Sequence, residues 1–223
     1  MDSFYTTQEL QKLGFKSLGE DILLSKKASI YGAQNISIGN NVRIDDFVIL
    51  SGHINIKSHI HIGAGSILMA KEEGIYLDDF SAMSVQCKIL GSSDDFSGNA
   101  LVGPCIPAEY RKITTKPIRL EKFSLLGCGS TILPGGSLAE GVSVGASSLI
   151  MRPTEAWGVY FGIPAKRISK RNKNILDLHE QFLASSNKIY NSMGGGDKQT
   201  LDSCFDLHSY SPNLFSIYSS KVA

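Results

Sequence analysis

The sequence predicts an all-β molecule, a parallel β-helix in which short strands wind into a solenoid. Two observations predict this fold. An aliphatic residue recurs at every sixth position along two blocks of the chain, and a row of small or β-branched residues stands four positions after these aliphatics. Such a pattern describes a short strand that turns a corner and continues, so that successive coils stack like the strands of a sheet.

The aliphatic row is unbroken within both blocks. An amphipathic helix would place apolar residues about three and four positions apart, and a meander of longer strands would need a turn signal about every 8–12 residues. Neither pattern fits a strict period of six. The row consists of Ile38, Ile44, Leu50, Ile56, Ile62 and Leu68 in the first block, and of Leu120, Leu126, Ile132, Leu138, Val144 and Ile150 in the second.

Caps and interruptions of the solenoid follow in chain order. Residues 1–25 are expected to form an amino-terminal cap, since Thr6 and Glu9 match a capping box and Gly14 can end a short helix. The β-helix is expected over 26–151. It is interrupted by a small insertion before Leu77 and by a loop over 89–119, which we expect to project from the solenoid and to cover a site.

Residues 152–183 are expected to leave the coil in a turn and then to form a capping helix. Ile175, Leu178 and Phe182 lie on one face of that helix. Residues 184–223 show no period of six and are expected to form a flexible tail.

Composition excludes several classes of protein. The chain has 22 Lys and Arg against 21 Asp and Glu, a net charge of +1, which gives no field for nucleic acid. No apolar run approaches the ~18 residues of a membrane span, and early acidic residues argue against a signal peptide, so a cytoplasmic protein is expected. The four cysteines contain no CxxC pair that would indicate zinc.

Three hexads carry a resemblance to a known family. IGAGSI (62–67), LGCGST (126–131) and VGASSL (144–149) share the pattern aliphatic-Gly-x-x-small-x and resemble the hexapeptide-repeat acyltransferases. GIPAKRI (162–168) resembles the carboxy-terminal signature of that family. With the SDD-aromatic-SG stretch, this ending is similar to sugar acetyltransferases of surface-polysaccharide gene clusters.

The resemblance implies fold, assembly and chemistry. The β-helix would be left-handed, against the general preference for right-handed crossovers. The protein would be a homotrimer with active sites between subunits. It would transfer acetyl groups from acetyl-CoA to a sugar or nucleotide-sugar acceptor in the biosynthesis of O-antigen or capsule, without a metal ion.

His61 is the candidate general base. Its neighbours Ile60 and Ile62 belong to the two inward rows, so its imidazole points outward from the coil. An imidazole that is mostly neutral at cytosolic pH suits removal of a proton from an acceptor hydroxyl. His53 and His59 are the other candidates.

The projecting loop departs from the pattern of many relatives. These place a histidine in an Asn-x-Asp-x-His loop, whereas GSSDDFSG (91–98) has none and Phe96 stands near its place. Asp94 and Asp95 become candidates for orienting the base or binding the acceptor. An Asx turn is the structural alternative for this pair.

By resemblance, a second group of residues would bind the coenzyme. Small residues would line the pantetheine, and Arg152 or Lys166 would meet the phosphates. Corner geometry and solvated surface charge are the structural alternatives. The candidate coenzyme-binding residues are Gly127, Gly145, Ala146, Arg152, Ala165 and Lys166.

The sequence leaves several functions open. O-acetylation is favoured, because a hydroxyl needs a general base more than an amine does. The alternatives are N-acetylation of an amino sugar, a metal hydratase similar to the gamma-type carbonic anhydrases that would use His53, His59 and His61, and a non-catalytic scaffold.

Overall fold

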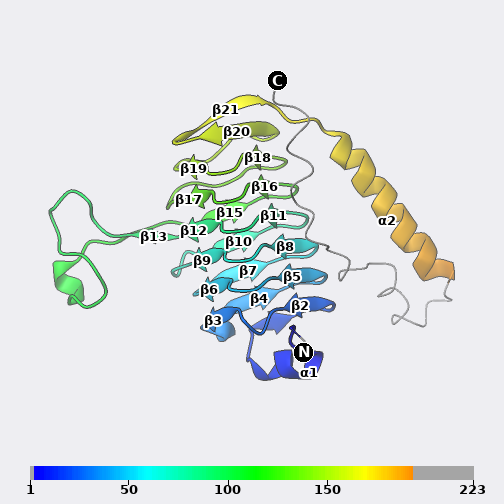
Figure 1. The fold of residues 1–223 in the computed structure, drawn as a ribbon, viewed down its shortest axis with the longest axis horizontal. Helices are drawn as coiled ribbons and strands as arrows, with labels where there is room; N and C mark the ends of the chain where they lie inside the picture. The colour runs from blue at the N-terminus through cyan, green and yellow to red at the C-terminus, as the bar shows by residue number, and fades with distance from the viewer. Residues whose placement is uncertain (1–2, 193–223) are drawn as a thin grey trace. The chain divides into compact units, whose positions relative to one another are not determined.

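The computed structural model describes residues 3–192 and divides into two compact units, Met1–Ile175 and Leu176–Ala223. The first unit is a left-handed parallel β-helix with three faces, which confirms the predicted fold class (Figure 1). The strands of each face pair in parallel with the strands one coil away, except at the last pair of one face.

We call the three faces A, B and C, and name the edges between them AB, BC and CA. Face A contains β1 (Ser17–Leu18), β4 (Ile36–Ile38), β7 (Ile54–Ile56), β10 (Ile75–Leu77) and β15 (Ile118–Leu120). Face B contains β2 (Ile22–Leu24), β5 (Val42–Ile44), β8 (Ile60–Ile62), β11 (Ala82–Met83), β16 (Leu125–Leu126), β18 (Ser143–Val144), β20 (Gly158–Gly162) and β21 (Ala165–Lys170). Face C contains β3 (Ser29–Tyr31), β6 (Ile49–Ser51), β9 (Ile67–Met69), β12 (Lys88–Leu90), β17 (Thr131–Ile132) and β19 (Leu149–Ile150).

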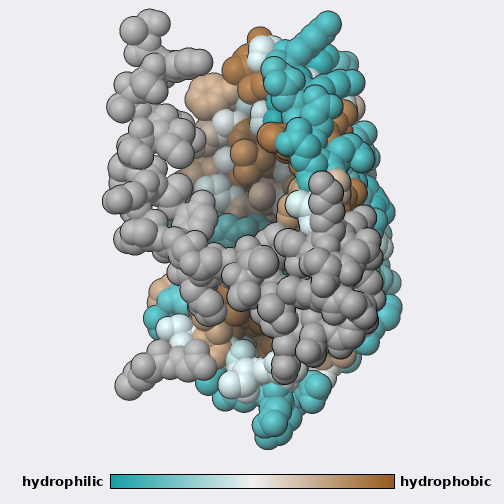
Figure 2. Space-filling model, turned by 90° about the vertical axis from the view of Figure 1, so that its right-hand side faces the viewer, coloured by the Kyte–Doolittle hydropathy of each residue, from teal (hydrophilic) through white to brown (hydrophobic). Residues whose placement is uncertain are grey.

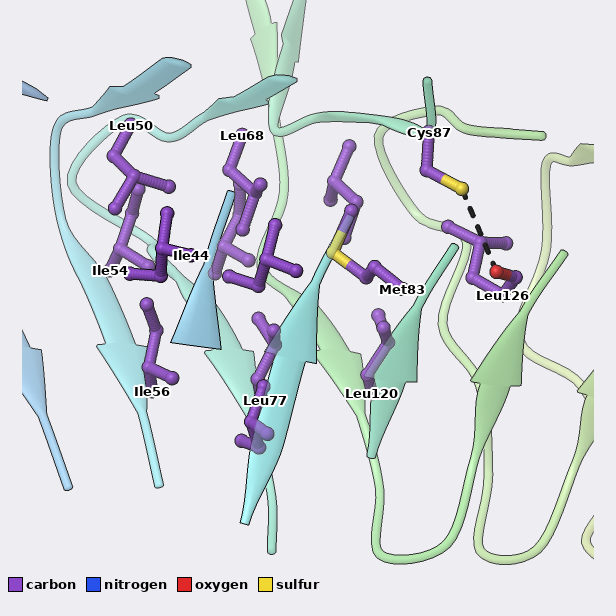
Figure 3. Packing of buried hydrophobic residues seen from close by; sticks show 14 of the residues in the cluster. Ile44, Leu50, Ile54, Ile56, Leu68, Leu77, Met83, Cys87, Leu120 and Leu126 are labelled. Atoms are coloured by element: carbon purple, nitrogen blue, oxygen red, sulfur yellow. Dashed lines mark hydrogen bonds between the residues drawn. The ribbon is translucent and has the colours of Figure 1, made fainter. Parts of the chain in front are cut away.

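The period of six produces the core, as predicted. All twelve aliphatics of the predicted row are at most 3% exposed. Figure 3 shows Leu50, Leu68 and Leu77 among the side chains that fill the interior between the strands. Burial of these ladders is the main stabilising contribution to the solenoid, because each coil alone is too thin to hide its aliphatic residues.

The chain leaves the coil twice at edge CA. A short insertion separates β9 from β10, and a longer segment, which we call the arm, spans residues 91–117 between β12 and β15. Antiparallel strands β13 (Ser92–Ser93) and β14 (Thr114–Thr115) form the base of the arm, and a 3-10 helix, η2 (Ala108–Tyr110), lies further out. The expected projecting loop is therefore present (Figure 1).

The amino-terminal end contains helix α1 (Thr7–Lys12), which has the predicted capping box between Thr6 and Glu9. Leu10 on this helix is buried in the solenoid core. A second 3-10 helix, η1 (Ala33–Asn35), lies before β4.

The prediction that the chain leaves the coil after Ile150 is wrong. β20 pairs in parallel with β18 and continues face B, and β21 then returns antiparallel along β20. Tyr160 joins the core at the position of the aliphatic row, but it lies sixteen residues after its partner Val144 rather than the eighteen of a full coil. Because of this irregular spacing, a search for hexads does not detect β20 as part of the solenoid.

A helix is present where one was predicted near the carboxyl end, but it is longer. α2 (Asn174–Ser192) runs beyond the expected limit at residue 183, so the first part of the predicted tail is helical. That this helix caps the solenoid stays a prediction. The rest of the predicted tail, 193–223, lies outside the described residues.

Candidate active site

His61 lies on the outer side of face B and is held by a carboxylate. Its Nε2 is 2.7 Å from Oδ2 of Asp45, and Nε of Arg43 donates to Oδ1 of the same carboxylate at 2.7 Å. The side chains of Asp45 and Arg43 are 17% and 22% exposed, and that of His61 is 37% exposed. An imidazole in this position is accessible from outside, while its orienting carboxylate is largely covered.

Arg43 and Asp45 were missed in the sequence, although a signal was present. Arg43 pairs with His61 in the register between β5 and β8, one full coil of eighteen residues apart. Outward residues separated by one coil are neighbours on the same face, so the period of six could have identified the partner of the histidine.

The carboxyl of Asp45 is held in its charged form. Burial by itself would raise the pKa of Asp45, but hydrogen bonds from His61 and Arg43 outweigh it, and the pKa lies below the usual value. Since a carboxylate can only accept, the Nε2 of His61 carries the hydrogen of this contact. A neutral imidazole in this orientation would accept a proton through Nδ1.

The candidate coenzyme glycines lie on the edge that His61 borders. Edge BC stacks the residues that follow the last inward residue of successive face B strands, and the backbone N–H of each one except the last, Phe161, bonds to a carbonyl of the coil above it. We call this row the corner column. It consists of Asp45, Gly63, Ser84, Gly127, Gly145 and Phe161.

Corner geometry explains the glycines of the column. A Cβ at Gly127 would lie 2.4 Å from the carbonyl oxygen of Val144, and one at Gly63 would lie 2.7 Å from the backbone of Ser84. The structural alternative raised for these residues is therefore sufficient. The same absence of side chains leaves backbone along this edge that an extended ligand could approach.

Apolar residues continue the outer side of face B beyond His61. Ala82 pairs with His61, Leu125 with Ala82, and Leu125 is 39% exposed. Face B lies on the right of Figure 1 and is turned toward the viewer in Figure 2, which shows hydrophobic residues in brown on this side. The region next to the corner column is thus suited to an apolar chain.

The other coenzyme candidates separate into two places. Ala146 follows Gly145, and Lys166 on β21 pairs with Phe161 at the end of the column. Ala165 pairs with Gly162 in the same hairpin. Arg152, in contrast, follows β19 at edge CA and is exposed, so the structure does not bring it to the column.

Asp94 and Asp95 lie in the arm, where their hydrogen bonds are local. Asp95 accepts from Ser97 Oγ at 2.8 Å and from the backbone N–H of Asn99 at 3.0 Å, and the Ser97 bond lowers the pKa of Asp95. This is the turn that the structural alternative describes. Asp94 faces Nη2 of Arg111 at 3.5 Å.

One chain does not bring the aspartates to the histidine. The arm leaves the solenoid at edge CA, whereas His61 lies on face B (Figure 1). Phe96, which stands in place of the family histidine, is 94% exposed.

The remaining histidine candidates lie on two further edges. His53 lies at edge CA, with Nδ1 3.2 Å from the carbonyl oxygen of Glu72, and His59 lies at edge AB, with its ring stacked on Phe80 at 4.5 Å. The three histidines therefore do not converge within one chain. Over residues 3–192, no group of three His, Cys, Asp or Glu side chains could hold a metal ion. No helix in that part of the chain is long and apolar enough to cross a membrane.

Comparison with known proteins identifies close relatives. No protein-family model matches the chain. It is 42% identical over 181 residues to dTDP-4-amino-4,6-dideoxy-D-glucose acyltransferase from Escherichia coli, covering 80% of this chain and 94% of the relative. It is 28% identical over 142 residues to WbbJ of E. coli K12, provisionally named a lipopolysaccharide biosynthesis O-acetyltransferase, covering 64% of each chain.

Solved structures of AntD, an N-acyltransferase from Bacillus cereus, share the fold. The complex of AntD with dTDP and 3-hydroxybutyryl-CoA has a TM-score of 0.82 and 46% identity, covering 84% of this chain and 100% of AntD. The S84C variant of AntD, with dTDP-4-amino-4,6-dideoxyglucose and coenzyme A, has a TM-score of 0.81 and 45% identity, with coverages of 83% and 99%. A D94A variant has also been solved with dTDP and coenzyme A. From its rows of hexads, its fold and these relatives, the chain belongs to the hexapeptide-repeat, left-handed β-helix acyltransferases.

Proposed function

We propose that the protein is an N-acyltransferase that transfers an acyl group, with acetyl as the first candidate, from coenzyme A to the amino group of a nucleotide-linked amino sugar. The observation that carries this proposal is the 42% identity, over 94% of its length, to an acyltransferase named for dTDP-4-amino-4,6-dideoxy-D-glucose. The hydroxyl acceptor favoured from the sequence has support only from a relative at 28% identity. Cytoplasmic synthesis of a surface-polysaccharide precursor is the setting we propose.

The chemistry requires a neutral amine next to a thioester. The amine nitrogen attacks the thioester carbonyl, the carbon–sulfur bond breaks, and coenzyme A leaves as a thiol once a proton has moved from nitrogen to sulfur. His61, oriented by Asp45, is the group beside the corner column that can accept the amine proton. Backbone N–H groups beside the column would be suited to the transient oxyanion.

The AntD variants add one residue to the proposed site and concern another that is already a candidate. AntD has been altered at a serine and an aspartate numbered 84 and 94, and this chain carries Ser84 and Asp94 at the same numbers. Ser84 lies in the corner column one coil beyond Gly63. We therefore add Ser84 to the candidate site, and we keep Asp94 as a residue that binds the acceptor.

A trimer would bring the arm and the column together. The outer side of face C is largely apolar, with Met69 48% and Met151 51% exposed, although Lys88 and Thr131 interrupt it. The matching row of face A is mostly polar, with Ser37, Asn55 and Arg119. Three copies that bury face C around a threefold axis would place edge BC of one copy beside edge CA of the next.

In that arrangement, the arm of one copy extends over the corner column of its neighbour. The arm carries apolar side chains that need cover, since Phe96 is 94%, Val102 57% and Tyr110 58% exposed. Asp94 would then approach His61 across the subunit boundary. The separation of these residues in one chain is what a site shared between subunits requires.

The acceptor is tested with a matched pair of nucleotide sugars. Acetyl-CoA is supplied with dTDP-4-amino-4,6-dideoxyglucose or with the same sugar bearing a hydroxyl at C4, and thiol release and product mass are measured. We expect turnover with the amine only. Acylation of the hydroxyl sugar in preference to the amine would overturn the proposal in favour of O-acylation.

His61→Ala tests the base in the same assay. We expect kcat to fall about a hundredfold, at the lower end of the ~10²–10⁴ that general-base catalysis contributes, with the oligomer intact. His59→Ala is the control, because that ring stacks on Phe80 at edge AB, away from the column. An unchanged kcat in His61→Ala would remove the base from the mechanism.

A further inference from the structure

A basic pocket lies on edge CA, below the arm. It has a volume of about 250 Å³ and is lined by Lys16, Asn35, His53, Lys71 and Glu72. Each lining residue belongs to the segment just before a strand of face A, so four successive coils contribute to it. None of these residues belongs to the corner column or to the arm.

The polar groups of this pocket favour an anion. Lys16 and Lys71 form no ion pair with any of residues 3–192, and Glu72 is the single acidic residue in the lining. Nδ1 of His53 lies 3.2 Å from the carbonyl oxygen of Glu72 and donates its hydrogen there, because a carbonyl only accepts, so this nitrogen fixes the ring and does not serve an anion. Asn35 adds an amide that can donate. Two ammonium groups and one side-chain amide are suited to phosphate oxygens.

The size of the pocket narrows the choice of anion. Pockets that enclose a whole drug-sized ligand measure roughly 300–1,000 Å³, and this one is smaller. It can therefore hold the phosphate groups of a nucleotide and leave the rest of the ligand outside. Two nucleotide substrates carry such groups, the acceptor and coenzyme A.

We propose that this pocket binds the diphosphate of the nucleotide-sugar acceptor, an inference that rests on the proposed function. The pocket shares edge CA with the arm, and the short insertion that supplies Lys71 and Glu72 contacts the arm through a hydrogen bond from Thr115 to Glu73. In the proposed trimer, this edge faces the corner column of the neighbouring copy. A diphosphate held here leaves the sugar directed toward the cleft, whereas the coenzyme candidates Ala146 and Lys166 lie at edge BC and its end.

The test compares lysine variants by direct binding and by kinetics. Lys16→Gln, Lys71→Gln and the double variant are titrated calorimetrically with dTDP, with pyrophosphate and with coenzyme A. Lys12→Gln, an equal loss of charge on α1 outside the pocket, is the matched control. We expect the Kd for dTDP and for pyrophosphate to rise at least about tenfold in the double variant, as the loss of charged hydrogen bonds predicts. The Kd for coenzyme A should stay unchanged.

Kinetics with the amino sugar should separate binding from chemistry. The KM for the acceptor should rise in the double variant, kcat should stay within about twofold, and Lys16→Arg with Lys71→Arg should retain binding. Thermal unfolding checks that every variant is folded. Equal dTDP affinity in the wild type and the double variant would overturn the inference, and so would a loss of coenzyme A affinity instead.

The outcomes also separate this inference from the proposed function. If the wild type acylates no amino sugar, while dTDP binding still depends on Lys16 and Lys71, the proposed function fails and the diphosphate site stands. If the amino sugar is acylated equally well by the double variant, the pocket assignment fails and the proposed function stands.

Discussion

At the scale of single residues, the carboxylate of Asp45 links the side chains of Arg43 and His61, the candidate base. One oxygen accepts from Arg43 and the other contacts His61. The carboxylate therefore fixes the ring and neutralises an arginine on the same face. Its hydrogen bonds keep the pKa of Asp45 below the usual value despite burial.

Asp45→Asn should lower stability at neutral pH and lose that effect in acid. A carboxyl whose pKa is lower in the folded state stabilises the fold above its unfolded pKa of about 3.9, and this stabilisation disappears as the pH falls through the folded value. Because the group is partly exposed, we expect a difference of about 1 kcal/mol at pH 7. Urea unfolding of both proteins at pH 7 and pH 3, at one protein concentration, measures it. A difference that grows toward pH 3 would contradict this sign.

Alkylation of the cysteines tests coenzyme binding at the corner column without an activity assay. Cys128 lies between Gly127 and Gly129 on edge BC and is partly exposed, whereas Cys87 is buried, and burial raises the pKa of its thiol to about 11. Cys105 is exposed on the arm.

Alkylation followed by peptide mass spectrometry should therefore give three different results. We expect Cys105 to react fast, Cys87 to stay unreacted until unfolding, and Cys128 to react at a rate that saturating coenzyme A lowers several-fold. Equal labelling of Cys128 with and without coenzyme A would argue against a coenzyme site along the column. Cys105 serves as the internal reference for alkylation.

At the scale of elements, the positions of edge BC differ in how much room they leave for a side chain. At Gly127 a Cβ would meet backbone, whereas at Gly145 the nearest atom is a ring carbon of Phe161 at 2.4 Å. Backbone one coil away cannot move without breaking the ladder. The ring of Phe161 is 54% exposed and can turn aside.

Gly127→Ala should accordingly be more destabilising than Gly145→Ala. We expect the first to lower the free energy of unfolding by more than about 2 kcal/mol, as overpacking against fixed atoms does, and the second by less than about 1.5 kcal/mol. Thermal unfolding of the two variants beside the wild type makes the comparison. Equal losses would show that the coils can separate at this edge.

At the scale of the whole molecule, the proposed trimer buries face C between copies. Met69→Lys together with Ile67→Lys places two charges on this apolar face, and we expect the trimer to dissociate and activity to be lost. Light scattering after gel filtration measures the mass. Ser37→Lys together with Asn55→Lys on face A is the control and should remain a trimer. If the face C variant remains a trimer, the interface between copies lies on another face.

The sequence predicted the repeated parts of this molecule well, because each hexad reports its own inward residues. Both rows of the core, both interruptions at edge CA and the amino-terminal cap could be predicted. The final rung formed by Tyr160 could not, since its spacing departs from six. The extent of α2 was missed because residues 184–192 show no clear apolar period.

The candidate site was predicted less completely from the sequence than the fold was. The glycines lie on the edge that His61 borders because both follow the period of six, and the partner Asp45 can be found from the same period. Arg152 was placed with the coenzyme candidates from its closeness in sequence to the last coil, yet it lies at edge CA, whereas Lys166 lies at the end of edge BC. No hexad encodes the proposed contact between copies, which would bring Asp94 toward His61.

The way the arm joins the solenoid has a consequence for how such enzymes diversify. The chain departs after β12 and re-enters at β15, which pairs with β10 as if nothing had been inserted. Lys116 N bonds back to the carbonyl of Gly91, so entry and exit are closed at one point. Evolution can lengthen, shorten or exchange this excursion without disturbing the repeat, and in the proposed site, where the arm binds the acceptor, such an exchange would give a new acceptor preference on an unchanged scaffold.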